Sequence, residues 1–303
     1  MKILLTGGTG LIGRSLVVEL IRQGHFIVLY TRDKVNARQR FEAPCPHFDA
    51  IIDCLDDVDF NKLDAVINLA GEPIVDKRWT EKQKQVLCDS RWLLTRDISS
   101  KILAAETPPS VFISGSAIGV YGRQGEKHVD ESLTDFYPDF SSKLCLQWEK
   151  YAGKADTDKT RVCLLRTGIV LSEKGGALAK MLPSFRLGLG GPISHGQQAM
   201  SWVHIQDMVA MIIFLLDQPE LRGAFNMTSP NPVSNKTFSK TLASTLNKPC
   251  LFKVPAWVLK LAMGEMSDLL IYGQYVYPQK LEDAGYVFRH PQLKSALNQL
   301  LQD

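Results

Sequence analysis

The sequence predicts an α/β fold, in which a doubly wound parallel sheet is followed by a smaller, mainly helical C-terminal region. Three observations lead to this prediction. A short apolar strand at residues 2–6 runs into a glycine-rich turn and then a helical pattern. Short apolar strands alternate with helical stretches until about residue 170. Beyond that point glycines and prolines cluster, which marks a change of architecture.

The expected strands are continuous apolar runs, as in a parallel sheet that helices cover on both faces. They lie at residues 2–6, 26–31, 64–70, 111–115 and 161–166, with a further strand ending at Asp53-Cys54. The expected helices lie at residues 80–105, 140–153, 206–217, 236–246, 255–264 and 291–301. Right-handed crossovers between such parallel strands give a Rossmann-type sheet.

The glycine-rich turn has the spacing of a dinucleotide-binding turn. Residues 8–13 fit G-x-G-x-x-G, and glycines 7, 10 and 13 fit the looser G-x-x-G-x-x-G. Glycines let the backbone turn tightly and approach a diphosphate, and the following helix directs unpaired N–H groups at the anion. The alternative is a turn that binds nothing, which the complete strand–turn–helix–strand unit disfavours. The residues expected to contact the cofactor here are Gly7, Thr9, Gly10, Leu11, Ile12 and Gly13.

The end of the second strand predicts which dinucleotide is bound. A site selective for NAD places Asp or Glu there, to accept hydrogen bonds from the ribose 2′-hydroxyl. This chain has Tyr30-Thr31-Arg32 instead. Because the planar guanidinium of Arg32 suits a 2′-phosphate, we expect NADP(H) to be preferred, with NAD(H) still open. The alternative is that Arg32 is an ordinary solvated surface charge.

Composition excludes several classes of protein. The net charge of +3 over 303 residues is too small to favour nucleic acid or a membrane surface as partner. The longest apolar run, Met208 to Leu216, is too short to span a bilayer. The six cysteines are scattered without metal-ligand spacing, so we expect reduced thiols, no metal and a cytoplasmic protein.

Several motifs resemble those of the extended short-chain dehydrogenase/reductase superfamily. They include Thr6 to Gly13, Asn68-Leu-Ala-Gly71, Ser114 to Gly122, Ser142-Lys-Leu144, Leu165 to Val170 and Trp202 to Asp207. Three further blocks resemble the YfcH-like epimerase subgroup, an atypical branch with its own C-terminal domain. They are Leu69 to Ile74 with Arg78-Trp79, Phe185 to Ile193, and Met263 to Met266 with Gln279 to Leu281.

The resemblance implies hydride transfer between a nicotinamide cofactor and a small polar substrate, with sugar nucleotides among the candidates. It implies an NAD(P)-binding Rossmann domain at residues 1–170, which also receives segments from about 195–228. The substrate-binding region and the subgroup's C-terminal domain then occupy residues 171–303. A homodimer through the helices at 80–105 and 140–153 is a further expectation of the superfamily.

The superfamily moves its proton with a Ser or Thr and a Tyr-x-x-x-Lys pair. Lys143 matches the lysine, but Asp139 stands where the tyrosine is expected. Tyr137 lies six positions before Lys143 and does not share its helix face. We therefore expect Tyr121 with Ser116 to supply the missing hydroxyls. The alternatives are Asp139 itself, a substrate group or water, and a purely structural Tyr121.

The resemblance implies further contacts from the ends of the later strands. The expected cofactor contacts are Thr31, Arg32, Asp53, Cys54, Asn68, Leu69, Ala70, Gly71, Glu72, Arg78, Ser114, Arg166 and Gly168. The expected substrate contacts are Phe185, Arg186, Trp202 and His204. For Glu72 and Arg78 the alternative is a surface ion pair, and for His204 it is a buried structural histidine.

Two functions follow from the sequence. The first is an NADP(H)-dependent oxidoreductase or epimerase. The second is an NADP(H)-binding sensor or regulator without robust catalysis, which the absent tyrosine at position 139 favours.

Overall fold

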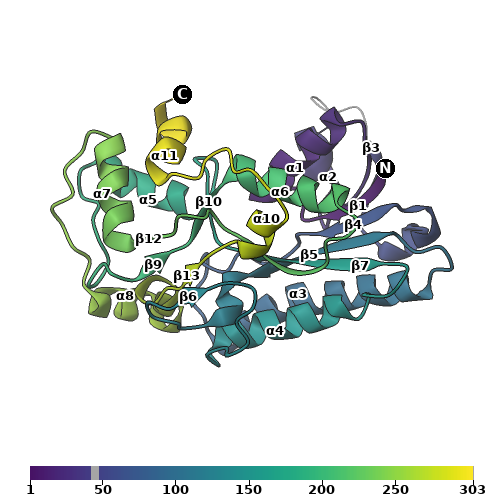
Figure 1. Cartoon of the computed structure of the whole chain (residues 1–303), viewed down its shortest axis with the longest axis horizontal. Helices are drawn as coiled ribbons and strands as arrows, with labels where there is room; N and C mark the ends of the chain where they lie inside the picture. Colours follow the sequence, from purple (N-terminus) through teal and green to yellow (C-terminus); the bar gives the residue numbers. More distant parts are fainter. Residues whose placement is uncertain (42–47, 303) are drawn as a thin grey trace.

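The computed structural model describes residues 1–41 and 48–302 and shows a seven-stranded parallel sheet with helices on both faces (Figure 1). The strand order is β11-β7-β5-β4-β1-β2-β3, so the winding reverses between β1 and β4. The strands are β1 (Lys2–Thr6), β2 (Phe26–Tyr30), β3 (Phe48–Ile52), β4 (Ala65–Asn68), β5 (Val111–Ala117), β7 (Arg161–Thr167) and β11 (Gly223–Met227). The predicted Rossmann-type sheet is confirmed.

Helices cover this sheet and build the second lobe. They are α1 (Leu11–Arg22), α2 (Lys34–Phe41), α3 (Glu81–Ala104), α4 (Phe140–Gly153), α5 (Gly176–Arg186), α6 (Ile205–Asp217), α7 (Asn235–Thr245), α8 (Ala256–Met263), α9 (Asp268–Ile271), α10 (Gln279–Asp283) and α11 (Leu293–Gln302). Among them, α1, α3, α4, α6, α7, α8 and α11 lie close to predicted ones, whereas α2, α5, α9 and α10 were not predicted. The predicted strand at 64–70 is shorter in the structure, because the chain leaves the sheet after Asn68 to pass the glycine-rich turn.

The sheet buries apolar side chains on both faces because its strands are apolar at successive positions. Ile3 and Leu5 pack with side chains of α1 and α6, whereas Leu4 packs with side chains of α3 and α4. Figure 1 shows these two pairs of helices on opposite faces of the sheet. None of these three side chains has any exposed surface. The sheet is therefore a central layer between two helical layers.

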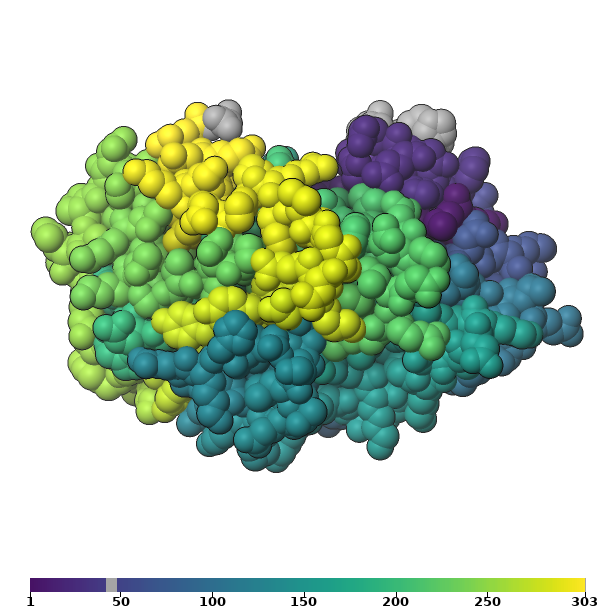
Figure 2. All heavy atoms as spheres, in the orientation of Figure 1, coloured from purple at the N-terminus to yellow at the C-terminus, as the bar shows by residue number. Residues whose placement is uncertain are grey.

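The chain returns to this sheet from the second lobe. After β10 (Trp202–His204), α6 packs against α1, and β11 then pairs in parallel with β7 at the edge of the sheet. The second lobe has its own core, in which α5, α7 and α11 surround Trp202 and Phe238. Figure 2 shows the last part of the chain, in yellow, lying across one face between α7 and α6, so the two lobes pack against each other.

Short two-stranded pairs connect the lobes. They are β8 (Ile169–Leu171) with β10, β9 (Ala199–Met200) with β12 (Val233–Ser234), and β6 (His128–Val129) with β13 (Tyr275–Val276).

Over the described residues, no helix is long and apolar enough to cross a membrane. In the same part of the chain, no three His, Cys, Asp or Glu side chains gather as metal ligands would. The five described cysteines are free thiols, and the expectation for Cys45 lies outside the described residues.

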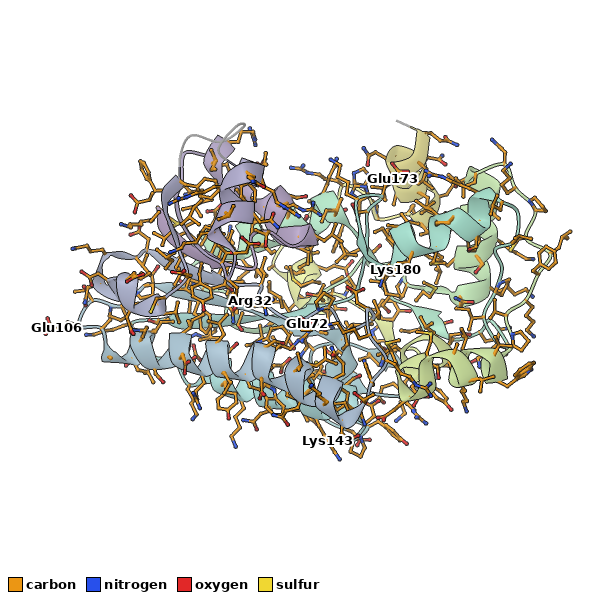
Figure 3. All side chains as sticks on the ribbon, turned by 180° about the vertical axis from the view of Figure 1, so that it is seen from behind. Arg32, Glu72, Glu106, Lys143, Glu173 and Lys180 are labelled. Atoms are coloured by element: carbon orange, nitrogen blue, oxygen red, sulfur yellow. The ribbon has the colours of Figure 1, made fainter. Side chains whose placement is uncertain are left out.

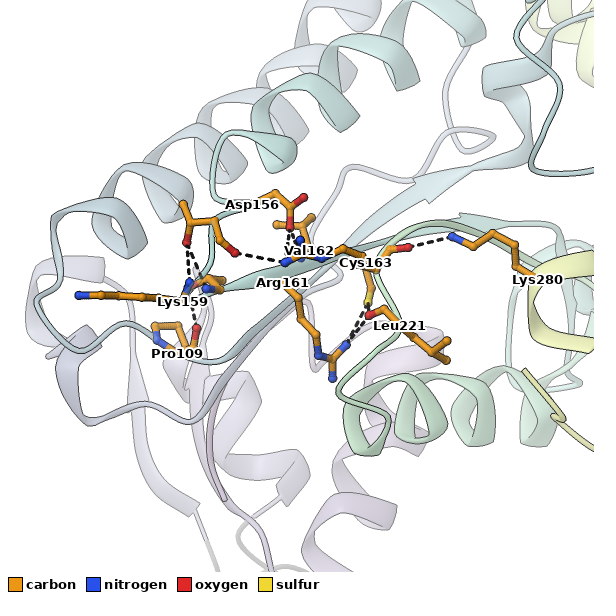
Figure 4. Close-up of polar contacts among 11 residues, drawn as sticks. Pro109, Asp156, Lys159, Arg161, Val162, Cys163, Leu221 and Lys280 are labelled. Atoms are coloured by element: carbon orange, nitrogen blue, oxygen red, sulfur yellow. Dashed lines mark hydrogen bonds and ion pairs between the residues drawn. The ribbon is translucent and has the colours of Figure 1, made fainter. Parts of the chain in front are cut away.

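A buried arginine fixes the position of α6. Arg161, at the start of β7, is 8% exposed and donates to the carbonyls of Leu215 and Leu216 at 2.8 and 3.0 Å. It also donates to the carbonyl of Leu221 at 2.9 Å (Figure 4). The last carbonyls of a helix have no partner within the helix and carry its partial negative charge. Arg161 therefore caps the C-terminal end of α6 and joins it to the sheet.

We predict that Arg161→Met lowers the free energy of unfolding by about 3 kcal/mol, because buried carbonyls left without donors cost roughly 1–3 kcal/mol each. Urea unfolding measures the loss. The matched control is Arg222→Met, which removes a half-exposed side chain from the same region and costs less than about 1 kcal/mol. Equal losses in the two variants would contradict the capping role.

Candidate functional site

A cavity of about 760 Å³ lies at the carboxyl ends of β1 to β4, where the winding of the sheet reverses. Open parallel sheets bind ligands at this position. The predicted residues that line it are Gly7, Thr9, Gly10, Thr31, Arg32, Asp53, Cys54, Leu69, Ala70, Gly71 and Glu72. Figure 3 shows Arg32 and Glu72 in this region, with Lys180 of the second lobe beyond Glu72.

The glycine-rich turn is in close contact with the end of β4. Gly7 has φ +70°, and a Cβ on it would lie 2.5 Å from the carbonyl carbon of Leu69. A Cβ on Gly13 would lie 2.2 Å from the oxygen of Gly7, so only glycine lets α1 begin this close to the turn. The first turn of α1 has no side-chain cap at Gly10. Its free N–H groups and the bare backbone beside them form a cradle for an anion.

A chain of buried hydrogen bonds holds the cavity floor. The Thr6 hydroxyl donates to Asn68 Oδ1 at 2.5 Å, and Asn68 Nδ2 donates to the Thr95 hydroxyl at 2.8 Å. The Ala70 N–H donates to the Thr6 hydroxyl at 3.2 Å. Asn68 is 1% exposed. Asn68 therefore lies beneath the cavity and does not line it. The predicted contact between Asn68 and the cofactor is replaced by a role in positioning Thr6 and Thr95.

Arg32 is the cation of the cavity that lacks a partner. Among the described residues, no hydrogen bond or ion pair is formed by its guanidinium. The nearby carboxylates are already paired, Asp53 with Lys34 at 2.8 Å and Asp56 with Lys101 at 2.5 Å. These lysines lower the pKa of both carboxyl groups. The cavity therefore presents an exposed guanidinium that is available to an added anion.

Other predicted cofactor residues lie outside the cavity lining. Leu11, Ile12 and Gly13 belong to the start of α1, and Gly168 packs against the carbonyl of Ser201. Ser114 and Arg166 are buried, and Arg78 is an exposed side chain against Gly264. Leu11, Ile12 and Gly13 therefore contribute the backbone at the start of α1, whereas Gly168, Ser114, Arg166 and Arg78 do not reach the cavity lining.

Under the end of β5 lies a buried polar network that the sequence did not predict. The Ser116 hydroxyl donates to Glu149 of α4 at 2.6 Å, and Arg166 binds the same carboxylate through two nitrogens, each at 2.9 Å. Arg166 also donates to the Tyr121 hydroxyl at 3.0 Å, and that hydroxyl donates to Asn226 at 2.7 Å. The network connects β5, α4, β7 and β11.

Tyr121 is a structural residue of this network, which corrects its predicted catalytic role. Its side chain has no exposed surface, and its hydroxyl has one donor and one acceptor within the protein. Burial raises the pKa of Tyr121 to about 12. A phenol in this position neither meets a ligand nor exchanges a proton near neutral pH.

The structure also corrects Lys143. Asp139 is the N-cap of α4, where its carboxylate accepts the N–H of Ser142 at 2.9 Å. Lys143 is exposed and points away from the cavity (Figure 3). The inward face of α4 carries Ser141, Cys145 and Glu149, spaced four residues apart. Two positions along a helix correspond to a rotation of about 200°, which places Lys143 on the solvent side.

Comparison of the sequence with known protein families identifies the family of this chain. The model of the NAD dependent epimerase/dehydratase family matches residues 3–227. The chain belongs to the NAD dependent epimerase/dehydratase family. A domain of unknown function, DUF1731, matches residues 254–300.

Relatives match over the whole chain. A chloroplastic SDR39U1 homologue of the epimerase family from Arabidopsis thaliana is 37% identical over 307 residues, covering 100% of this chain and 87% of the relative. A human epimerase family protein, SDR39U1 isoform 2, solved with NADPH, superposes with a TM-score of 0.89 at 30% identity over 100% of both chains. A nucleoside-diphosphate sugar epimerase from Corynebacterium glutamicum has a TM-score of 0.76 at 26% identity, covering 99% of this chain and 58% of that one.

The predicted substrate residues of this epimerase/dehydratase family member do not line an open site. Phe185, Trp202 and His204 are 3%, 0% and 0% exposed, and the first two belong to the core of the second lobe. Arg186 is at the surface in an ion pair with Glu173 at 2.9 Å. These assignments are corrected, because an apolar or aromatic side chain beside a Gly-rich segment is as well suited to a core as to a pocket.

The sequence analysis did not predict that α3 forms one wall of the cavity. The α3 residues that line the cavity are Asp89, Ser90, Leu93, Leu94, Asp97, Ser100 and Lys101. Tyr30, Leu55 and Asp56, which lie at or after the ends of β2 and β3, also line it and were not predicted. The available signal was the helical spacing of 90, 93, 94, 97 and 101 directly after the fourth strand.

His204 caps the N-terminus of α6. His204 Nδ1 accepts the N–H of Gln206 at 3.1 Å, and its ring lies 3.9 Å from that of His290. Asp207 accepts the N–H groups of Arg289 and His290, both at 2.8 Å. Burial, together with His290, lowers the pKa of His204 to about 4.

We predict a loss of stability in mild acid that depends on His204. The unfolded chain takes up a proton at an ordinary histidine pKa of about 6.5, whereas folded His204 stays neutral until about pH 4. Its contribution is therefore complete above about pH 6.5 and declines as the pH falls toward 4. His204→Asn keeps an acceptor at the cap and makes this decline shallower. Urea unfolding at several pH values compares the two, and parallel curves would contradict the assignment.

Proposed function

We propose that the chain binds NADP(H) in this cavity, with the 2′-phosphate at Arg32, and acts as an oxidoreductase or epimerase on a small polar substrate. The observation that carries the proposal is the unpartnered guanidinium of Arg32 at the end of β2, beside carboxylates that lysines already pair. The human relative solved with NADPH supports it. The name of the Corynebacterium relative supports a sugar nucleotide as the substrate class.

The residues present fit this cofactor. The bare backbone at Gly7 and the uncapped start of α1 suit a diphosphate, and Thr31 with Arg32 suit the phosphorylated ribose. Leu69 to Gly71 let the chain after β4 approach the ribose closely. When bound, the cofactor supplies or accepts a hydride at its nicotinamide ring. The protein's own contribution is to hold this molecule, orient the substrate and move a proton.

We propose that Ser116 moves the proton, with Glu149 behind it. The Ser116 proton is directed at the Glu149 carboxylate, and its oxygen keeps the capacity to accept a hydrogen bond from a substrate hydroxyl through the 4% of the residue that is exposed. As that substrate proton transfers to Ser116 Oγ, the Ser116 proton transfers to Glu149. Arg166 keeps the carboxylate in place throughout. This arrangement stands in for the tyrosine and lysine that α4 does not present.

A second candidate function is an NADP(H)-binding sensor that performs no hydride transfer. Two observations favour it, since Asp139 is committed to capping α4 and Lys143 lies on the solvent side. The two functions share the cofactor site and differ in whether a hydride passes between the bound cofactor and a substrate.

We predict that Arg32→Ala weakens NADPH binding by about 10–100-fold, the value of a charge-assisted hydrogen bond, and changes NADH affinity by less than about threefold. Cofactor fluorescence titration measures both constants. The matched control is Arg22→Ala at the far end of α1, where the side chain is paired with Glu19, and it leaves both affinities unchanged. An equal loss for NADPH and NADH would show that Arg32 does not read the 2′-phosphate.

We predict that a metabolite extract incubated with deuterium-labelled NADPH yields a labelled product, and that Ser116→Ala lowers this hydride transfer by about 100-fold. NADPH affinity stays within about twofold, because Ser116 lies outside the cofactor cavity. Mass spectrometry detects the product. Tight NADPH binding without any labelled product would exclude a reductase and leave the sensor or an epimerase, which returns its hydride to the substrate. Unchanged transfer in Ser116→Ala would remove Ser116 from the mechanism.

A further inference from the structure

Arg91 is a partly buried cation directly behind the cavity lining, where its guanidinium contacts the lining residues Gly71 and Glu72. It belongs to α3, next to Ser90, which lines the cavity. Its guanidinium donates to the backbone carbonyl of Glu72 at 2.9 Å, and lies so close to Gly71 that a Cβ there would be 3.1 Å from its Cζ. The guanidinium also lies over the ring of Trp148, 5.3 Å from the centroid. It therefore sits between the chain after β4 and the inward face of α4.

Arg91 differs from the other buried arginines in its charge balance. Arg166 has the Glu149 carboxylate, and Arg161 has the partial negative charge at the C-terminal end of α6. Arg91 has the neutral acceptors Glu72 O, Leu87 O and Ser90 Oγ. Among the described residues, no carboxylate lies within ion-pair distance of Arg91, and its Nε has no hydrogen-bond partner. A partly buried charge without a counter-ion is unfavourable, and an added anion relieves it.

Burial lowers the pKa of Arg91, in agreement with the missing counter-ion. The nearest carboxylate, that of Glu72, is bound to Lys77 at 3.0 Å. The inward face of α4 carries Ser141, the thiol of Cys145, whose pKa burial raises to about 12, and Glu149, whose carboxylate Arg166 already binds through two nitrogens. The anion that balances Arg91 must therefore come from a ligand.

The course of α3 indicates which part of a ligand this is. At one end of the cavity, Lys101 is paired with Asp56 near Arg32, after β3 and β2. At the other end, the Ser90 hydroxyl accepts the N–H of Glu72 at 3.1 Å, after β4. A dinucleotide with its 2′-phosphate at Arg32 therefore directs its other half toward Ser90 and Arg91.

We propose that Arg91 binds the nicotinamide mononucleotide half of the dinucleotide and that the phosphate of this half is its counter-ion. This deepens the proposed function and rests on it. The chain thus holds its cofactor by two guanidinium groups at opposite ends of one helix wall, Arg32 at the adenosine end and Arg91 at the reactive end. Arg91 supplies from α3 the cation that the inward face of α4 lacks.

The test compares two probes, NADPH and 2′,5′-ADP, which contains the adenosine end alone. We predict that Arg91→Met weakens NADPH about 10–100-fold and leaves 2′,5′-ADP within about twofold. Calorimetric titration measures both. Arg91→Lys keeps the positive charge while losing the planar group, so it recovers most of the NADPH affinity. The matched control is Arg22→Met on α1, an exposed arginine paired with Glu19 outside the cavity, which changes neither constant.

Each outcome has one meaning. Loss of NADPH affinity with 2′,5′-ADP retained supports the proposal. Equal losses for the two probes, or no change for NADPH, overturn it, because Arg91 is then a structural residue or a bystander. If Arg91→Met does not fold, Arg91→Lys decides, since a preserved 2′,5′-ADP affinity with a measurable NADPH loss of about threefold still separates the two halves. Failure of wild-type protein to bind either probe would refute the proposed function itself.

Discussion

The close approach of the glycine-rich turn to the end of β4 is the constraint on which the site depends. Gly7 and Gly13 leave no room for a Cβ, and Thr6 and Asn68 bind the two strand ends to each other beneath them. Asn68 then reaches Thr95, which also accepts the indole N–H of Trp148 at 2.9 Å. One continuous set of contacts thus fixes β1, β4, α3 and α4 relative to one another. The cavity lies above these contacts, between α3 and the residues that follow β1, β2, β3 and β4.

The same contacts explain why α3 both supports the cavity from beneath and forms one of its sides. Its inward side is held by Thr95, and the positions beside it carry Ser90, Asp97 and Lys101 into the cavity. Because the helix runs the length of the cavity, it brings polar groups to both ends of an extended ligand. Loop 71–79 adds a link to the second lobe, where Lys180 of α5 pairs with Asp76. Binding at the cavity and the packing of the lobes are therefore mechanically connected.

The Ser116–Glu149–Arg166–Tyr121 network lies where the superfamily has its Ser or Thr and its Tyr-x-x-x-Lys pair, and it contains different residues. The ion pair of Arg166 and Glu149 is almost fully buried, with side chains 8% and 10% exposed. Such a pair is costly to bury unless its hydrogen bonds are satisfied, and here Ser116 and Tyr121 satisfy them. In this network the Tyr121 hydroxyl has only protein partners, so Tyr121 has a structural role. Ser116 is the member of the network nearest the end of β5. It orders the region where the superfamily places its proton-transfer groups.

The sequence by itself determined the sheet, the glycine-rich turn and the residues that follow β1, β2 and β4, because these depend on local apolar runs and on backbone that only glycine permits. Tertiary packing decided the rest. Lys143 matches a motif, yet a shift of two positions on α4 turns it to solvent and turns Cys145 and Glu149 inward. Tyr121, Trp202 and His204 became core residues because the second lobe closes over them. No sequence pattern identifies Arg91 as a binding residue. That it lacks a counter-ion depends on which side chains surround it in three dimensions, and this is seen only after α3, α4 and the end of β4 have packed together.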